Sequence, residues 1–202
     1  MGKRFLLIGA ETLSRVIDHY DRDSMIFADG AGAVIVDGVE EEKKRGLLSH
    51  AAATHSNEEL HYLNFGKSYK PETDVNMKFI KMQGRKIYEY SLTHVPVAMK
   101  QAMDKCNCEI DDLKKIIIHQ ANEKMDAAIV KRFFRLYKKP MPKDIMPMSI
   151  RNLGNSSVAT MPTLLDLMLK GEYKEHPINQ DDLILFASVG AGMNINAFTY
   201  KF

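Results

Sequence analysis

The sequence contains little cysteine, little net charge and no long apolar run. The two cysteines, Cys106 and Cys108, stand one residue apart, a spacing that closes no useful disulfide loop and supplies no four-ligand zinc site. A net charge of +2 is too small to indicate a nucleic-acid partner. No apolar run approaches the roughly 20 residues of a membrane span, and the first residues lack the apolar segment of a signal peptide. We therefore expect a cytoplasmic protein with reduced cysteines and no membrane or nucleic-acid partner.

The apolar content is large enough to form a folded core. Of the 202 residues, 45% are apolar, which excludes wholesale disorder and allows one large domain or two small ones. Strand patterns occur at 5–9, 113–119, 183–188 and 194–202, and helix patterns occur at 84–106, 122–137 and 158–170. Because strands alternate with helices, we predict an α/β fold with a layered sheet.

The N-terminal part combines short apolar stretches with small residues. Residues 24–36 predict two strands hinged at Asp29-Gly30-Ala31-Gly32-Ala33, where glycine lets packed layers approach closely; a plain turn explains the run equally well. Residues 40–80 are predicted to be loop-rich. This stretch contains three histidines whose spacing matches no established metal-ligand pattern, so we expect no metal site from His50, His55 and His61.

Three polar or glycine-rich segments stand where an α/β fold binds its ligands, beyond the carboxyl ends of strands. They are His119–Asn122, Gly154–Ser157 and Gly190–Gly192. Taken singly, each has a structural explanation: a hydrogen-bonded histidine, a helix cap and a tight hairpin. Neither cysteine is placed as a nucleophile, because no strand delivers it and acidic neighbours disfavour a thiolate.

The helix that follows His119 has one basic face and one apolar face. The basic residues are spaced by seven, four and three positions, so they share a face; they are Lys124, Lys131, Arg135 and Lys138. The apolar face contains Met125, Ile129, Phe133 and Leu136. The basic stripe is either an ordinary solvated face or a docking surface for an acidic partner.

Five motifs in the same order resemble those of the β-ketoacyl-acyl-carrier-protein (ACP) synthase III family. Ile118–Asn122 resembles the histidine motif of the family, and Leu153–Thr160 resembles its asparagine motif. Phe27–Ala33 resembles its Gly-Asp-Gly-Ala-Gly-Ala segment, Leu7–Glu11 the strand before it, and Ser188–Gly192 its C-terminal glycine loop. The resemblance covers essentially the whole chain.

The resemblance implies a thiolase-like fold, a five-layer αβαβα sandwich of two similar halves. Residues 1–202 then form the C-terminal half, in which 1–80 are a linking part and loop region and 81–202 are the core. The missing N-terminal half would carry the nucleophilic cysteine, so this chain alone is expected to be inactive. A homodimer is also expected from the family.

The reaction implied by the resemblance is a decarboxylative Claisen condensation. An acyl group from acyl-CoA is joined to malonyl-ACP in fatty-acid or related lipid synthesis, with no bound cofactor. His119 and Asn155 would donate hydrogen bonds to the thioester oxygen during decarboxylation, and Gly190 and Ala191 would form the oxyanion loop.

The resemblance also assigns residues that bind CoA or ACP. Asn122 and Tyr88 would line the pantetheine tunnel. Positive charge at Lys124, Lys131 and Arg132 would contact the carrier protein or the CoA phosphates.

The sequence departs from the family at two places, which leaves substrate choice open. Ala28 stands where the family usually has glycine, and Ala191 adds a methyl group beside the proposed oxyanion site. Two other functions stay open. The chain could belong to another thiolase-fold acyltransferase, such as a hydroxymethylglutaryl-CoA synthase or a quinolone-type synthase, or it could be a non-catalytic partner subunit or fragment.

Overall fold

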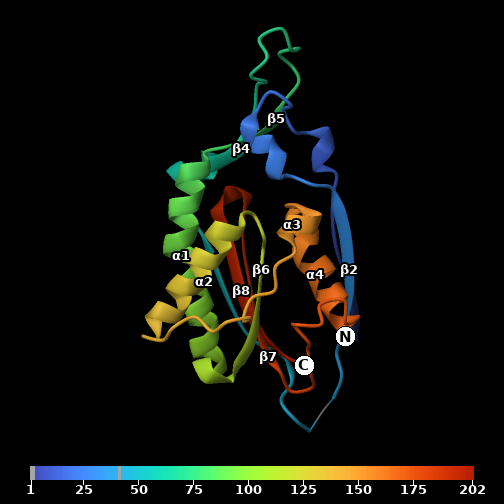
Figure 1. Cartoon of the computed structure of the whole chain (residues 1–202), viewed down its shortest axis with the longest axis vertical. Coiled ribbons are helices and arrows are strands. Elements are labelled where there is room, and N and C mark those ends of the chain that lie inside the picture. The colour runs from blue at the N-terminus through green and yellow to red at the C-terminus, as the bar shows by residue number, and fades with distance from the viewer. Residues whose placement is uncertain (1–2, 41) are drawn as a thin grey trace.

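The computed structural model describes residues 3–40 and 42–202 (Figure 1). The strands are β1 Arg4–Glu11, β2 Gly30–Asp37, β3 Gly46–Thr54, β4 Leu63–Gly66, β5 Phe79–Met82, β6 Leu113–Ile118, β7 Leu183–Gly190 and β8 Asn194–Lys201. The α-helices are α1 Gly84–Cys106, α2 Glu123–Leu136, α3 Ile150–Leu153 and α4 Thr160–Leu169. Short 3-10 helices occupy Leu13–Arg15, Arg22–Ile26, Glu58–Tyr62, Ile110–Asp112, Ser157–Ala159 and Ala191–Met193.

The core is a four-stranded sheet in the order β3-β8-β7-β6, with β6 and β7 parallel and the other pairs antiparallel. Helices α1 and α2 cover one face and α4 covers the other (Figure 1). Successive side chains of a strand point to opposite faces, so Ile116 and Ile118 pack toward α1 and α2 while Ile117 packs toward α4. Each buried isoleucine contributes roughly 1.5–3 kcal/mol. The prediction of a layered α/β sheet is confirmed.

Helix α1 has the bounds that its apolar spacing predicts. Val95, Met99 and Met103 recur every four residues and are fully buried against the sheet and α2. The helix ends because Asn107 takes a left-handed conformation, with φ 55°, which asparagine tolerates better than most residues. Within the described part of the chain, no helix is both long and apolar enough to cross a membrane.

A second, two-stranded sheet, which we call the ribbon, is formed by β1 and β2. The ribbon lies beside α4 (Figure 1). Its glycines allow that contact: a Cβ at Gly9 would lie 2.4 Å from the Val158 carbonyl oxygen, and one at Gly32 would lie 2.6 Å from the Thr163 nitrogen. The predicted close approach at small residues is therefore confirmed.

The third pair of strands, β4 and β5, is tied to the loop after β1 by a buried ion pair. The Lys81 ammonium lies 2.6 Å from Asp18 and 2.8 Å from Asp21. The Asp18 carboxylate also accepts from the Tyr69 N–H and the Ser68 hydroxyl. Burial would raise the pKa of Asp18, but these donors together hold that pKa well below its ordinary value.

Several predictions about the N-terminal part were wrong. Met25–Phe27 is not a strand, because Arg22–Ile26 form a 3-10 helix. The stretch 40–80 contains the nine-residue strand β3, which pairs with β8 and so adds an edge strand to the core sheet. Glu41, in the stretch predicted to be loop-rich, lies outside the described residues.

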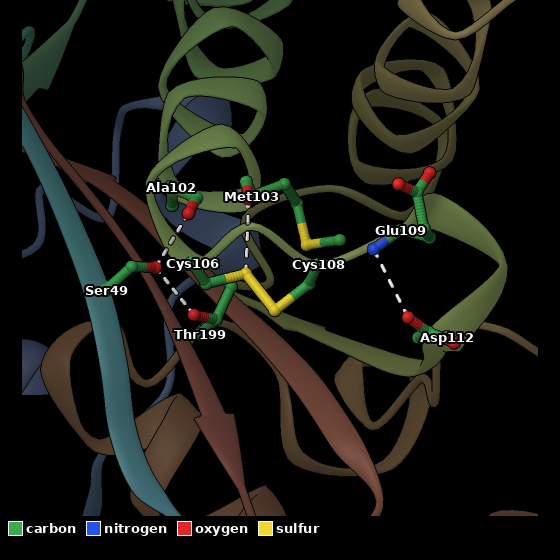
Figure 2. The surroundings of a disulfide bond; sticks show 8 residues. All are labelled: Ser49, Ala102, Met103, Cys106, Cys108, Glu109, Asp112 and Thr199. Carbon is green, nitrogen blue, oxygen red and sulfur yellow. Dashed lines mark hydrogen bonds between the residues drawn. A yellow bond between two sulfur atoms is a disulfide. The ribbon is translucent and has the colours of Figure 1, made fainter. Parts of the chain in front are cut away.

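The expectation of two free cysteines was also wrong. Cys106 and Cys108 form a disulfide (Figure 2). The left-handed Asn107 turns the chain at the end of α1 and brings the two Cα atoms to 5.3 Å, within the range that a disulfide spans.

Candidate active site

A cavity of about 320 Å³ opens where β6 and β7 end. Its lining brings together four residues that the sequence singled out: His119, Asn155, Gly190 and Ala191. The remaining lining residues are largely apolar and include Leu13, Phe27, Leu63, Ile80 and Met161. Three sequence segments that are far apart along the chain therefore meet at one apolar pocket with a few convergent polar groups, the usual composition of a binding site.

His119 is delivered by the buried strand β6. Its backbone N–H donates to the Ala187 carbonyl at 2.9 Å, which extends the β6–β7 ladder by one residue. Burial lowers the pKa of the imidazole to about 4, and a hydrogen bond between the ring and the Ser157 backbone opposes this shift only in part. The ring is therefore neutral at physiological pH.

Asn155 is held by backbone contacts with the segment before β2. Its N–H donates to the Ile26 carbonyl and its carbonyl accepts from the Ala28 N–H, each at 2.9 Å. The side-chain Oδ1 accepts from the Ser157 N–H at 3.0 Å. Because the acceptor end of the amide is engaged, the group that Asn155 can offer the cavity is its NH2 donor.

The predicted helix cap at this segment was wrong. Helix α4 begins at Thr160, and its N-terminal neighbour Ala159 makes no side-chain cap hydrogen bond. The Asn155 side chain is used instead to shape the turn at Ser157, whose φ is 51°. Gly154 is also left-handed, and a Cβ there would lie 2.8 Å from the Ala28 Cβ, so the alanine at position 28 makes glycine at 154 necessary.

The glycine loop is fixed by side chains from neighbouring strands. Gly192 and Met193 are left-handed, with φ 72° and 50°. The Asn194 amide donates to the Ala191 carbonyl at 3.0 Å, and the Thr54 hydroxyl donates to the Asn194 amide oxygen at 2.6 Å. The loop thus has a defined shape before any ligand binds.

Gln120 links the histidine and asparagine motifs, a role that the sequence analysis missed. Its side chain is fully buried, and the Nε2 donates to the Pro147 carbonyl at 2.9 Å. The Oε1 accepts from the backbone N–H groups of Ser149 and Ile150. The residue beside His119 therefore holds the start of α3, which leads to Asn155.

The predicted CoA- and ACP-binding residues do not line the cavity. Asn122 caps α2 by accepting from the Lys124 and Met125 N–H groups. Arg132 donates to the Leu92 carbonyl of α1 at 3.1 Å. The others are exposed on α1 and α2; they are Tyr88, Lys124 and Lys131.

Solved structures of the same architecture cover nearly all of this chain. The 3-oxoacyl-[acyl-carrier-protein] synthase III of Aquifex aeolicus has a TM-score of 0.82 and 26% identity, covering 99% of this chain and 58% of that one. The 3-oxoacyl-(acyl carrier protein) synthase III of Pseudomonas aeruginosa has a TM-score of 0.82 at 21% identity, with the same coverage. The fold and the cavity at its strand ends thus define a thiolase-type α/β protein.

Family comparisons then narrow the class. The model described as 3-oxoacyl-[acyl-carrier-protein (ACP)] synthase III C terminal matches residues 103–202, and the 3-oxoacyl-[acyl-carrier-protein (ACP)] synthase III model matches residues 1–56. The β-ketoacyl-[acyl-carrier-protein] synthase III of Acaryochloris marina is 31% identical over 204 residues, covering 98% of this chain and 58% of the relative. The chain belongs to the 3-oxoacyl-ACP synthase III family, and it spans about 58% of the length of that relative.

Proposed function

We propose that this chain supplies the decarboxylation donors and the oxyanion loop of a 3-oxoacyl-ACP synthase III-type condensing enzyme in fatty-acid or related lipid synthesis. The observation that carries the proposal is the shared cavity of His119, Asn155, Gly190 and Ala191. The substrates would be an acyl-CoA and malonyl-ACP, with no bound cofactor.

In the proposed decarboxylation step, the bond between the malonyl methylene carbon and its carboxylate breaks and carbon dioxide leaves. The electron pair passes into the thioester as an enolate, whose oxygen carries the negative charge. A neutral His119 N–H and the Asn155 NH2 would donate to that oxygen. Preorganised donors of this kind each lower a barrier by roughly 3–4 kcal/mol in a water-poor site.

In the proposed condensation step, the enolate carbon attacks the carbonyl of an acyl group held as a thioester. A carbon–carbon bond forms, the carbonyl oxygen becomes negative, and the thiolate leaves when the carbonyl re-forms. The Ala191 N–H would donate to that oxygen. The disulfide occupies both Cys106 and Cys108, so we propose that the acyl-bearing thiolate comes from a further polypeptide segment.

The ribbon is where we propose that this further segment packs. Four consecutive side chains of β1 are each more than half exposed; they are Phe5, Leu6, Leu7 and Ile8. An apolar groove lies beside them, lined by residues such as Val34, Val158 and Leu165. A contiguous exposed apolar strand is typical of a surface that another chain segment covers. A homodimer is a further prediction from the family.

The first test is the intact mass of the protein purified from its native source with any associated polypeptides, before and after incubation with acetyl-CoA. One added acetyl group on a cysteine of a covalently or non-covalently associated segment supports the proposal. If the 202-residue chain is isolated alone and stays unmodified, the chain is a non-catalytic partner or fragment instead.

The second test separates the two half-reactions in the assembled enzyme. His119→Ala and Asn155→Ala should each slow carbon dioxide release from malonyl-ACP by about 10²–10³-fold, while acyl transfer to the cysteine changes much less. The exposed His19 offers a matched control, since His19→Ala should change neither rate. Equal losses in both half-reactions would contradict the roles proposed for His119 and Asn155.

Carrier docking needs a separate test, because Asn122, Tyr88, Lys124, Lys131 and Arg132 lie outside the cavity. Reversing the charge of exposed Lys131 (Lys131→Glu) should raise the KM for malonyl-ACP more than the KM for acyl-CoA. Lys114→Glu, an exposed change on β6, is the control. Equal shifts of both KM values would contradict docking on α2.

A further inference from the structure

Three aromatic side chains form a cluster that supports the glycine loop without lining the cavity. Tyr90 lies on α1 and is only 5% exposed. His55 follows β3, and His94 lies one turn after Tyr90 on α1. The ring centroid of His94 lies 4.5 Å from the ring centroid of His55 and 4.5 Å from that of Tyr90, so the three rings pack as one unit.

The hydrogen bonds of this cluster have only one consistent direction. The Tyr90 hydroxyl donates its single hydrogen to the Met193 carbonyl oxygen at 2.9 Å, because a carbonyl can only accept. The His55 Nδ1 lies 2.5 Å from the same hydroxyl oxygen. That nitrogen must therefore carry a hydrogen and donate it to Tyr90. The result is a relay from His55 Nδ1–H through the Tyr90 hydroxyl to the Met193 carbonyl.

The far end of the relay is the strained part of the glycine loop. Met193 is a left-handed non-glycine residue at φ 50°, a conformation that persists only where the surroundings enforce it. Its carbonyl also accepts from the His55 backbone N–H at 3.3 Å, and its side chain is 2% exposed in the core. His55 thus holds the Met193 peptide twice, once directly and once through Tyr90.

The electrostatic surroundings keep the tyrosine able to donate. Burial, and secondarily the charge of Glu59, raises the pKa of Tyr90 to about 12, so its hydroxyl keeps its proton. Burial, followed by the nearby His55, lowers the pKa of His94, which Glu59 opposes. His94 therefore packs against the relay mainly as a neutral ring.

We propose that Tyr90 and His55 are positioning residues: their relay fixes the Met193 peptide and thereby presents the Ala191 N–H to the cavity. The effect on catalysis rests on the function proposed above. The relay itself can be tested without any enzymatic activity, so failure of one proposal is distinguishable from failure of the other.

The test compares Tyr90→Phe with Tyr137→Phe. Tyr137, at the end of α2, also has a pKa raised to about 12 by burial, and its hydroxyl has no hydrogen-bond partner among the described residues. The control therefore removes a similar hydroxyl but no relay. In ¹⁵N-labelled protein, His55 should show a protonated Nδ1 and an Nδ1–H resonance that shifts in Tyr90→Phe and not in Tyr137→Phe.

Two further readouts connect the relay to the loop. Amide hydrogen exchange of His55, whose N–H donates to the Met193 carbonyl of the loop, should rise about tenfold or more in Tyr90→Phe and stay unchanged in the control. In the assembled enzyme, Tyr90→Phe should slow the condensation step about tenfold while carbon dioxide release from malonyl-ACP changes less than about twofold, because only the condensation uses the Ala191 N–H.

Each outcome bears on the proposal. A His55 protonated only at Nε2 would overturn the relay, whatever the enzyme assay gives. If the relay is present in the wild type but His55 amide exchange is unchanged in Tyr90→Phe, or if condensation and carbon dioxide release slow equally, the positioning role is overturned. An inactive wild-type protein would count against the proposed function, while the tautomer and exchange data would still decide the relay and its hold on the loop.

Discussion

The core sheet and the ribbon differ in how they bury their apolar side chains. Strand β7 has five consecutive buried residues, Leu183–Ala187, because helices cover both faces of the core sheet. Strand β1 also has a run of apolar residues, but Phe5–Ile8 are each more than half exposed. The core sheet is stabilised by contacts within the chain, whereas the ribbon has an uncovered apolar strand.

The two sides of the cavity are built on these two unequal supports. His119 extends the core sheet, since its N–H bonds to β7. Asn155 is paired with the segment before β2 and follows Gly154, which packs on Ala28. We therefore propose that the core sheet holds His119 rigidly, whereas the position of Asn155 depends on how the ribbon packs.

The largest expected effect is on stability, in a comparison of a leucine in the core sheet with a leucine in the ribbon. Leu185→Ala should lower the free energy of unfolding of this chain by about 2–5 kcal/mol, because Leu185 is fully buried. Leu6→Ala should lower it by less than about 0.5 kcal/mol, because Leu6 is 62% exposed. Denaturant unfolding of both variants checks this. Similar losses would show that the ribbon is already covered in solution.

Gly9→Ala should disrupt the packing of the ribbon against the segment that leads into α4. The new Cβ would clash with the Val158 carbonyl oxygen. The backbone must shift to avoid this clash, which should lower the free energy of unfolding by about 3 kcal/mol. Hydrogen exchange should increase in β1, β2 and the segment around Asn155 before it increases in the core sheet. The control is Gly38→Ala, where the nearest atom to a new Cβ is 3.6 Å away. An equal increase in hydrogen exchange in the ribbon and in the core sheet would contradict the view that the two sides of the cavity are supported separately.

Gln120→Leu should weaken the connection between the His119 side and the Asn155 side of the cavity. The change leaves the Pro147 carbonyl and the Ser149 and Ile150 N–H groups without their partner, at a cost of about 2 kcal/mol. Thermal unfolding of Gln120→Leu beside Gln101→Leu, an exposed change on α1, measures this cost. If the two variants unfold alike, Gln120 does not link the motifs energetically.

The smallest expected effect is the response of His119 to mild acid. Its pKa of about 4 lies below the ordinary 6.5, so its neutral form persists and carbon dioxide release should change less than about twofold between pH 7 and 6. The same depression makes its stability contribution complete above pH 6.5 and lost as the pH falls toward 4. An NMR titration that places the His119 pKa near 6.5 would contradict both statements.

Local patterns predicted the parts of the fold that depend on local spacing. The apolar repeat gave the bounds of α1, and three consecutive isoleucines placed His119 at the end of a buried strand. The fold class and family were also predicted correctly, because five ordered motifs are specific where one is not.

The features that were predicted wrongly or not at all depend on contacts between residues far apart in the sequence. Strand β3 is rich in alanine and carries His50, so it lacks a strong apolar alternation, and only its pairing with β8 makes it a strand. The partners of Gln120 lie almost 30 positions away in an irregular loop. His55 was considered only as a metal ligand, and its contact with Tyr90 spans 35 positions. Residue-by-residue spacing contains no signal for such contacts.

The attachment of the asparagine segment to the ribbon has a consequence for how the protein folds. The Ser157 hydroxyl donates to Glu11 across 146 positions of the chain, one of the longest loops this molecule can close. Helices and hairpins form from near neighbours, whereas closing so long a loop costs entropy before its contacts form. In a refolding experiment, the cavity should therefore be completed late, after most of the secondary structure has returned.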